Sequence, residues 1–336
     1  MISCPRQVPS PEAAPLRRSL AGRYLWLIGL ALYIVIVWYI GWQRISSALR
    51  GLNVVFLFAL IVLESATVWF RAFKWRFALG QRNHAVALYF VSKAAGGMSP
   101  GRVGELAPLL LKGHRTPRLG AWIVFDRLIE IAATLGLGLL GLIVLRVPHR
   151  GAIVILCILF LLVLVIGPLF ILTRHRWFAS LAARCNEASL TYRVMRFLAD
   201  VSAESLQLRH LMPAVSAMTL LATASDIVVS ILLYQALGYS VGFMVLAVVQ
   251  SAHGIISAIP FTPNATGVPY LIAADIIHEL TPVPWEVLAV SVILRTACTN
   301  AVFWTSFGIG AATFKKRITA ENKGNGDTGN GTSFIG

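Results

Sequence analysis

Residues Ile227–Ala274 read IVVSILLYQALGYSVGFMVLAVVQSAHGIISAIPFTPNATGVPYLIAA, a run of 48 residues without one Asp, Glu, Lys or Arg. A helix that crosses a bilayer needs about 20 apolar residues, so the run holds more than one membrane pass. Within it, Ile259–Pro269 contains three prolines, an asparagine and a glycine, which together break a helix. Broken backbone at membrane depth is tolerated only where protein buries it or where it lines a watery cavity. The stretch therefore predicts a polytopic membrane protein with a functional broken segment.

The composition of the whole chain agrees with this interpretation. Of its 336 residues, 57% are hydrophobic and 13% are charged, with a mean hydropathy of +0.75, whereas soluble domains average about 25% charged residues. The net charge of +15 comes from basic residues that flank the apolar runs. Such residues are typical of cytoplasmic loops that face anionic lipid headgroups, so we expect no nucleic-acid partner. The four cysteines form no C-x-x-C motif and no metal or cofactor motif is found, so we expect neither a metal nor a cofactor.

Six apolar runs are long enough to be full membrane spans. They cover residues 24–42, 52–70, 119–145, 151–173, 211–237 and 285–314. Two further segments, 85–113 and 241–279, are apolar but interrupted, the first by Gly96–Arg102 and the second by Ile259–Pro269. Each is too broken for one span and long enough for two half-helices that enter and leave on the same side. We therefore expect an all-α polytopic membrane protein with about six full spans and two re-entrant helical hairpins.

The distribution of arginine and lysine orients this chain. Segments 1–22, 174–210 and 315–336 carry clusters of basic residues, namely Arg6, Arg17, Arg18, Arg174, Arg176, Arg184, Arg193, Arg196, Arg209, Lys315, Lys316, Arg317 and Lys323. The loops between the other ends of the spans hold fewer. Both termini are therefore predicted to be cytoplasmic, and the tail 315–336, rich in Asn, Gly and Thr, is predicted to be disordered.

With this orientation the two halves of the chain have opposite topologies. Residues 23–147 form a first repeat with the re-entrant segment 85–113 on the cytoplasmic side. Residues 151–314 form a second repeat with the re-entrant segment 241–279 on the outer side. Inverted-topology repeats with paired broken segments are typical of transporters, whose substrate site lies where the broken helices meet near the membrane midplane.

The first broken segment contains Ser99-Pro100-Gly101-Arg102-Val103-Gly104-Glu105, which suits an anion site. Pro100 fits the first position of a half-helix, whose free N–H groups attract an anion. Arg102 adds a bidentate donor for phosphate. Arg102 and Glu105 are three residues apart and share a helix face. Two interpretations stay open here: a phosphate-binding site that includes Ser99, Arg102 and Glu105, or an ion pair that holds a loop.

The span 119–145 carries Asp126, Arg127 and Glu130 near its start, and the two acids share a face by their i,i+4 spacing. Charges inside a membrane are costly and normally face the bundle interior or a cavity. Arg127 and Arg102 are available partners for these carboxylates. The cluster is either a lipid-headgroup or proton site, or an ion-pair network that locks the helices near the cytoplasmic interface.

Other polar features of the spans favour structural roles. Four single charges, Glu64, Asp226, Asp275 and Arg295, are expected to belong to structural pairs rather than to contact a substrate directly. The pattern Gly136-x-Gly138-x-x-Gly141 matches a dinucleotide-binding motif, but it lies inside an apolar span without a preceding strand. Close packing of helices explains these glycines better.

Three of these blocks resemble a known family, the flippase-like membrane domain of lysylphosphatidylglycerol synthases. Ser99–Glu105 is similar to that family's small-Arg-x-Gly-Glu segment, and Phe125–Glu130 looks like its Glu-Arg-Leu-x-Asp block with the two acids exchanged. The third block is Pro263–Val268, followed by Arg295 in the last span. The resemblance covers residues 21–314.

The chain departs from the family at the second re-entrant tip, where relatives usually have Pro-Gly-Gly-x-Gly-Val-x-Glu. Asn264 and Ala265 replace the glycines, Pro269 precedes the acid's position, and Tyr270 replaces the acid. No soluble aminoacyl-transferase domain is recognised, so lysyl transfer is not implied. The resemblance implies movement of an anionic lipid or a polyprenyl-linked headgroup between leaflets.

We therefore expect a lipid translocator of the bacterial inner (plasma) membrane rather than an enzyme. The expected substrate-binding residues are Ser99, Arg102, Glu105, Asp126, Arg127, Glu130, Asn264, Tyr270 and Arg295. The expected partners are anionic or polyprenyl-phosphate lipids. A homo-oligomer and a monomer are both compatible with the sequence. The alternatives are an integral-membrane transferase that uses a lipid-linked donor, and a non-catalytic partner of a lipid or glycan biosynthetic enzyme.

Overall fold

The computed structural model of the protein describes residues 34, 38, 41–80, 84–97, 99–111, 116–145, 174–187, 189–258 and 268–327, and their regular secondary structure is helical. In chain order the helices are α2 (Trp42–Arg50), α3 (Val54–Leu79), α4 (Ala85–Gly97), η2 (Pro100–Leu110), α5 (Pro117–Leu145), α7 (His175–Ala183), α8 (Leu190–Leu208), η3 (Arg209–Leu211), α9 (Met212–Ala236), α10 (Phe243–Ala258), α11 (Val268–Leu280) and α12 (Trp285–Asp327). The helices labelled η are 3-10 helices. The expected all-α class is confirmed.

Four of these helical segments are long and apolar enough to cross a membrane, counting only the described residues. They are α3, α5, the part Trp285–Gly310 of α12, and the run Leu190–Ala236 that ends in α9. They correspond to the expected spans 52–70, 119–145, 285–314 and 211–237. The expected spans 24–42 and 151–173 lie outside the described residues, apart from positions 34, 38, 41 and 42. The chain is therefore a multi-pass integral membrane protein.

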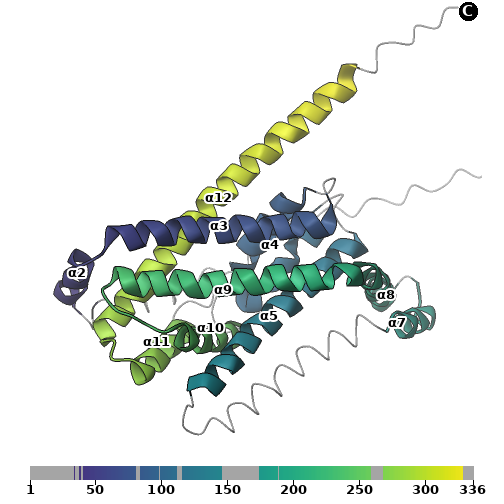
Figure 1. Ribbon diagram of the computed structural model, residues 1–336. Helices are drawn as coiled ribbons and strands as arrows, with labels where there is room; N and C mark the ends of the chain where they lie inside the picture. Colours follow the sequence, from purple (N-terminus) through teal and green to yellow (C-terminus); the bar gives the residue numbers. More distant parts are fainter. Residues whose placement is uncertain are drawn as a thin grey trace, which may run out of the picture.

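Helices α3 and α9 lie side by side and antiparallel (Figure 1). The backbone N–H of Asn53, just before α3, donates to the carbonyl of Ala236 at the end of α9, 2.8 Å away. Both helices are followed by a glycine with positive φ, Gly80 at 79° and Gly238 at 84°, a conformation that ends a helix at little strain. This pair connects the two halves of the chain.

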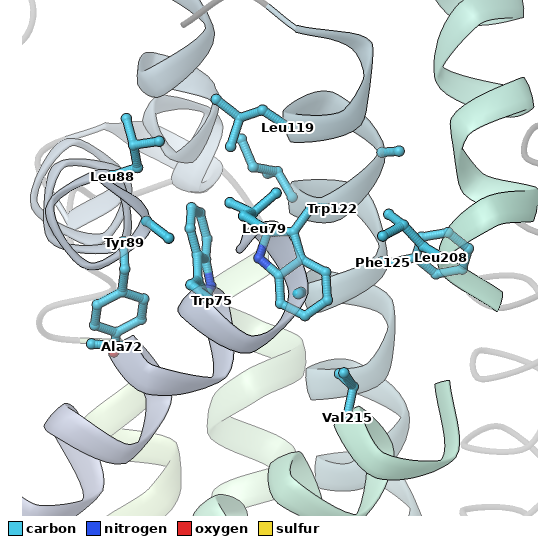
Figure 2. Close-up of a cluster of buried hydrophobic side chains, with 14 of the residues drawn as sticks. Ala72, Trp75, Leu79, Leu88, Tyr89, Leu119, Trp122, Phe125, Leu208 and Val215 are labelled. Atoms are coloured by element: carbon cyan, nitrogen blue, oxygen red, sulfur yellow. The ribbon is translucent and has the colours of Figure 1, made fainter. Parts of the chain in front are cut away.

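A buried cluster near the carboxyl end of α3 joins it to α4, α5, α8, α9 and α12. Figure 2 shows Trp75 of α3 between Tyr89 of α4 and Trp122 of α5. The Trp75 ring meets both edge-on, with centroid distances of 5.8 Å to Tyr89 and 6.3 Å to Trp122. A second cluster joins the other half of α3 to α2, α9, α10, α11 and α12. Along α3, Glu64 lies between these clusters, and Arg71 and Lys74 lie within the stretch of the first.

Both interrupted segments fold as two helical pieces. α4 packs against η2, and α10 packs against α11. The proline-rich stretch between α10 and α11, residues 259–267, lies outside the described residues. The second piece of the first segment is a 3-10 helix with Pro108 inside it. A proline in the interior of an α-helix removes a hydrogen bond and clashes with the preceding turn, which accounts for the tighter helix.

Helix α5 packs closely on α10 through glycines, as the sequence predicted. A Cβ on Gly138 would lie 2.2 Å from the Cβ of Ser251, and one on Gly141 would lie 2.7 Å from the carbonyl oxygen of Met244. Gly136 has nothing within 4 Å of such a Cβ. The pattern therefore serves helix packing at Gly138 and Gly141.

The basic segment 174–210 forms α7, α8 and η3, which lie together at the amino-terminal end of α9 (Figure 1). α8 also packs on α5, where Gly120 leaves room for Phe197 and Val201. The arginines of this segment are exposed, namely Arg174, Arg176, Arg184, Arg193, Arg196 and Arg209. This end of the bundle is therefore strongly basic.

Helix α12 is longer than the expected span, because it continues from Gly310 to Asp327. The tail 315–336 that is predicted to be disordered overlaps this helix over residues 315–327. Ala320, Glu321 and Lys323 are good helix formers, and a helix already formed in the span extends into them without a new nucleation step. Figure 1 shows this yellow end of α12 leaving the packed helices.

Candidate functional site

Four charged side chains from three helices meet beside the first broken segment, and we name them the hairpin cluster: Lys93 of α4, Glu105 of η2, and Arg127 and Glu130 of α5. Arg127 donates to both acids, at 2.6 Å to Glu105 and 2.8 Å to Glu130. The Lys93 ammonium lies 3.1 Å from Glu130 and 3.7 Å from Glu105. Two cations and two carboxylates thus form a closed ring of ion pairs.

Glycines and serines hold Glu105 in this place. A Cβ on Gly96 would lie 2.4 Å from the Cγ of Glu105, and one on Gly104 would lie 2.1 Å from the carbonyl oxygen of Ala95. The N–H of Gly104 donates to the Ser99 hydroxyl at 2.7 Å, and the Ser92 hydroxyl donates to the carbonyl of Glu105 at 2.8 Å. Only glycine permits so close an approach of α4 and η2, which directs Glu105 toward α5.

The cations of the hairpin cluster are more accessible than its carboxylates. The side chains of Arg127 and Lys93 are 25% and 17% exposed, against 9% for Glu105 and 13% for Glu130. The guanidinium of Arg127 is therefore the most accessible charged group of the cluster.

A neighbouring ion pair is sealed. The Lys74 ammonium of α3 lies 2.5 Å from the Asp126 carboxylate of α5, and their side chains are 1% and 3% exposed. The indole N–H of Trp75 donates to Asp126 at 2.9 Å, and Lys74 donates to the Thr219 hydroxyl of α9 at 3.0 Å. This pair ties α3, α5 and α9 together beneath the hairpin cluster.

Two further pairs lie near the middle of the spans, and we name their four residues the central group. Arg71 of α3 donates to Asp226 of α9, and Arg295 of α12 donates to Glu64 of α3 at 3.0 Å. Again the cations are more exposed, at 24% for Arg71 against 10% for Asp226 and 19% for Arg295 against 5% for Glu64. The expectation that Glu64, Asp226 and Arg295 belong to ion pairs is confirmed.

The positive and negative charges of the described ion pairs are equal in number. They contain five cations, Arg71, Lys74, Lys93, Arg127 and Arg295, and five carboxylates, Glu64, Glu105, Asp126, Glu130 and Asp226. Unpaired charges inside a membrane are strongly unfavourable, so this balance lowers the free energy of the folded state relative to an unmatched set.

The structure brings several of the expected site residues together and leaves others apart. Glu105, Arg127 and Glu130 meet in the hairpin cluster, Asp126 is buried behind it, and Arg295 belongs to the central group. Ser99 caps η2 through the N–H of Gly104. Arg102 belongs to η2, but its side chain lies outside the described residues, as do Asn264 and the side chain of Tyr270. Asp275 is exposed on α11.

Sequence reasoning missed three cations, Arg71, Lys74 and Lys93. Each follows or interrupts an apolar run that is otherwise compatible with a membrane helix. Their position could have identified them, because a lysine or arginine within a membrane span needs a partner in the helix bundle. Lys74 and Arg71 are three residues apart on α3, yet they pair with different helices, α5 and α9.

Comparison with known proteins agrees with this architecture. The sequence profile of the family described as the lysylphosphatidylglycerol synthase TM region matches residues 26–307. No curated protein and no solved structure shows a significant match. The profile covers well over half of the chain, and it includes both broken segments and all ten of the ion-paired residues. The chain therefore belongs to the family of the lysylphosphatidylglycerol synthase transmembrane region.

Proposed function

We propose that the protein is a translocator that moves an anionic phospholipid or a polyprenyl-phosphate headgroup between the leaflets of the bacterial inner membrane. The observation that carries the proposal is the hairpin cluster. It stands at a broken helix inside the membrane domain, and its two cations are more accessible than the carboxylates that hold them. Membership of a family named for a lipid synthase's membrane region is consistent with a lipid substrate.

The contacts between helices support an inverted repeat. If the two halves exchange places, α3 corresponds to α9, α4 and η2 to α10 and α11, and α5 to α12. Three contacts then have counterparts: α5 packs on α10 and α12 on α4, α5 packs on α9 and α12 on α3, and α3 packs on α4 and α9 on α10. The pair α3 and α9 corresponds to itself. Such a pattern is expected of two repeats related by a two-fold axis.

The proposed orientation places the basic end of the bundle in the cytoplasm. The carboxyl end of α3 and the amino end of α9 share this end with α7 and α8. An exposed Arg76 in the last turn of α3 adds to the arginines of α7 and α8. Positive charge in short loops favours the cytoplasmic side, which agrees with cytoplasmic termini and with a first re-entrant segment that opens toward the cytoplasm.

In this proposal a lipid phosphate enters from the cytoplasmic leaflet and binds Arg127 and Lys93. Phosphate oxygens accept the same paired N–H donors as a carboxylate, so the headgroup can replace Glu105 or Glu130 at Arg127, while the displaced carboxylate keeps Lys93 as its partner. Arg102, at the start of η2 after Ser99, is proposed to hold the same phosphate. Asp126 shapes the site by fixing α5 to α3 through Lys74.

The second broken segment is proposed to supply the other side of the site. Asn264 and Tyr270 replace a glycine and an acid of the family's usual pattern and would offer neutral hydrogen-bonding groups to the headgroup. Broken helices that face each other near the midplane are the usual place for a transporter's substrate. The proposed substrate-contacting set thus combines Arg102, Arg127 and Lys93 with Asn264 and Tyr270.

Transbilayer movement in reconstituted vesicles tests the proposal. Fluorescently tagged lipids with anionic, zwitterionic and polyprenyl-phosphate headgroups are placed in vesicles with the purified chain, and a membrane-impermeant quencher reports the accessible leaflet. We expect an anionic or polyprenyl-phosphate lipid to move between leaflets faster in vesicles with the protein than in vesicles without it. Arg127→Gln should lose this increase in rate. Arg193→Gln, which removes an exposed arginine of α8, is the matched control and keeps the gain. Equal rates with and without protein for every lipid would refute the function.

A further inference from the structure

On α3, the central group lies further from the carboxyl end of the helix than the sealed pair of Lys74 and Asp126. Along α3, Arg71 precedes Lys74 by three residues and Glu64 precedes it by ten, which places them about 4.5 Å and 15 Å further along the helix axis at 1.5 Å per residue. Asp226 interacts electrostatically with both Arg71 and Arg295 and with Glu64. The four side chains thus form one group, and it stands where α3 of the first half meets α9 and α12 of the second.

Polar atoms in and beside the central group have unused hydrogen-bonding capacity. The Nε of Arg71 is buried and has no hydrogen-bond partner among the described residues, and the same holds for the hydroxyl of Thr299. Thr299 follows Arg295 by one helical turn and shares its face. An unused donor inside a membrane protein is unfavourable unless an acceptor occupies the site for part of the working cycle. A phosphate has enough oxygens to accept from several donors at once.

The accessibility of the side chains also points to an anion. In both pairs the guanidinium is the more exposed partner, and the carboxylate lies behind it. The sealed pair of Lys74 and Asp126 differs, because neither of its charges is accessible. The described residues therefore contain both a sealed ion pair and pairs whose cation is partly exposed.

We infer that the central group is a second anion-binding site, in which Arg71 and Arg295 receive the phosphate of the lipid after it leaves Arg127 and Lys93. This inference rests on the proposed function. Asp226 and Glu64 neutralise the two guanidiniums while the site is empty, and the phosphate replaces a carboxylate when it arrives. At each step the phosphate lies beside a cation, so that the charge of the lipid is neutralised while it crosses the apolar interior.

The first test compares two isosteric changes by thermal unfolding of the purified full chain. Asp226→Asn removes the carboxylate that pairs with the accessible Arg71. Asp126→Asn removes the carboxylate that pairs with the sealed Lys74. With short-chain phosphatidic acid as the probe, we expect the melting temperature of Asp226→Asn to rise by about 5 °C or more. The melting temperature of Asp126→Asn should rise no more than that of the unmodified chain, because the lipid phosphate cannot reach Lys74. Equal gains in the two variants would overturn the inference.

The second test needs no variant that could fail to fold. Phenylglyoxal modifies accessible arginines, and mass spectrometry of the unmodified chain measures the extent at each position. Phosphatidic acid should lower the modification of Arg71 and Arg295 several-fold and leave the exposed Arg193 unchanged. Inorganic phosphate at equal concentration should protect them less. Protection by inorganic phosphate but not by the lipid, or protection of Arg127 without Arg71, would overturn the second site.

These readouts separate the inference from the proposed function. Vesicles that show no lipid movement, combined with protection of Arg71 by the phosphate lipid, would refute translocation and leave the second site standing. Lipid movement combined with an unprotected Arg71 would refute the second site alone.

Discussion

Glu105 of η2 and Arg127 of α5 are joined by a 2.6 Å ion pair, although they stand 22 residues apart in the sequence. The pair fixes the short 3-10 helix to the neighbouring span, and Lys93 of α4 closes the ring from the other side. The half-helix cannot move along α5 without exchanging this contact for another. A ligand that competes for Arg127 therefore acts on the position of the broken segment.

Removal of Glu105 should affect stability and transport in different ways. Glu105→Gln leaves Arg127 and Lys93 with one carboxylate between them, and the loss of one partner of a buried pair typically costs about 3–5 kcal/mol. We expect a lower melting temperature in detergent, and partial recovery in the double variant Glu105→Gln/Arg127→Gln. Lipid movement should stay low in the single and in the double variant. In the double variant the phosphate-binding cation Arg127 is missing. Recovery of transport in the double variant would assign Glu105 and Arg127 a purely structural role.

Arg102 is predicted to bind phosphate at the start of η2. Lysine cannot reproduce the planar fork of a guanidinium, so Arg102→Lys should clearly slow lipid movement and Arg102→Ala should nearly abolish it. Both proteins should be recovered folded, as judged by gel filtration and melting temperature. Normal transport by a folded Arg102→Ala would remove Arg102 from the site.

The close approach of α4 and η2 makes Gly104 sensitive to a single methyl group. In Gly104→Ala the new Cβ would lie 2.1 Å from the carbonyl oxygen of Ala95, so the hairpin must open. Overpacking of this kind typically costs about 1–3 kcal/mol, and we expect a lower melting temperature together with slower transport. Gly136→Ala is the control, because its Cβ would meet nothing within 4 Å. A Gly104→Ala protein as stable and active as Gly136→Ala would contradict the described packing.

The inverted repeat predicts opposite access to the two broken segments. In a background without native cysteines, Ser99→Cys should react with a membrane-impermeant thiol reagent only after the cells are permeabilised. Asn264→Cys should react in intact cells. Labelling of both positions from the same side would exclude repeats of opposite topology.

Hydropathy and helix breakers were sufficient to predict the framework. The apolar runs predicted α3, α5, α9 and the span of α12, and the Gly-Pro interruption predicted the break between α4 and η2. These features follow from local sequence, because backbone groups in a membrane must be satisfied within a helix and proline prevents this locally. The glycines at positions 138 and 141 were likewise recognisable as packing sites.

The partners of the charges were only partly predictable. The spacing of Arg102 and Glu105 placed them on one helix face, but local sequence did not show the contacts of Glu105 with Arg127 and Lys93, because Gly96 and Gly104 set the position of η2. Arg71 and Lys74 appear in the sequence as the basic end of a span, and nothing local shows that they pair with Asp226 and Asp126 on distant helices. Such contacts depend on how the helices pack.

We propose that the protein recognises the negative charge of a lipid phosphate and carries it across the bilayer. The most direct measurement compares, in the same vesicles, the transbilayer rates of a phosphate-bearing lipid and of its neutral methyl phosphotriester. A preference of about tenfold corresponds to about 1.4 kcal/mol, well within the strength of one charge-assisted contact. We predict at least this preference for the charged lipid, and its loss in Arg127→Gln. Equal rates for the two lipids would refute recognition of the phosphate charge.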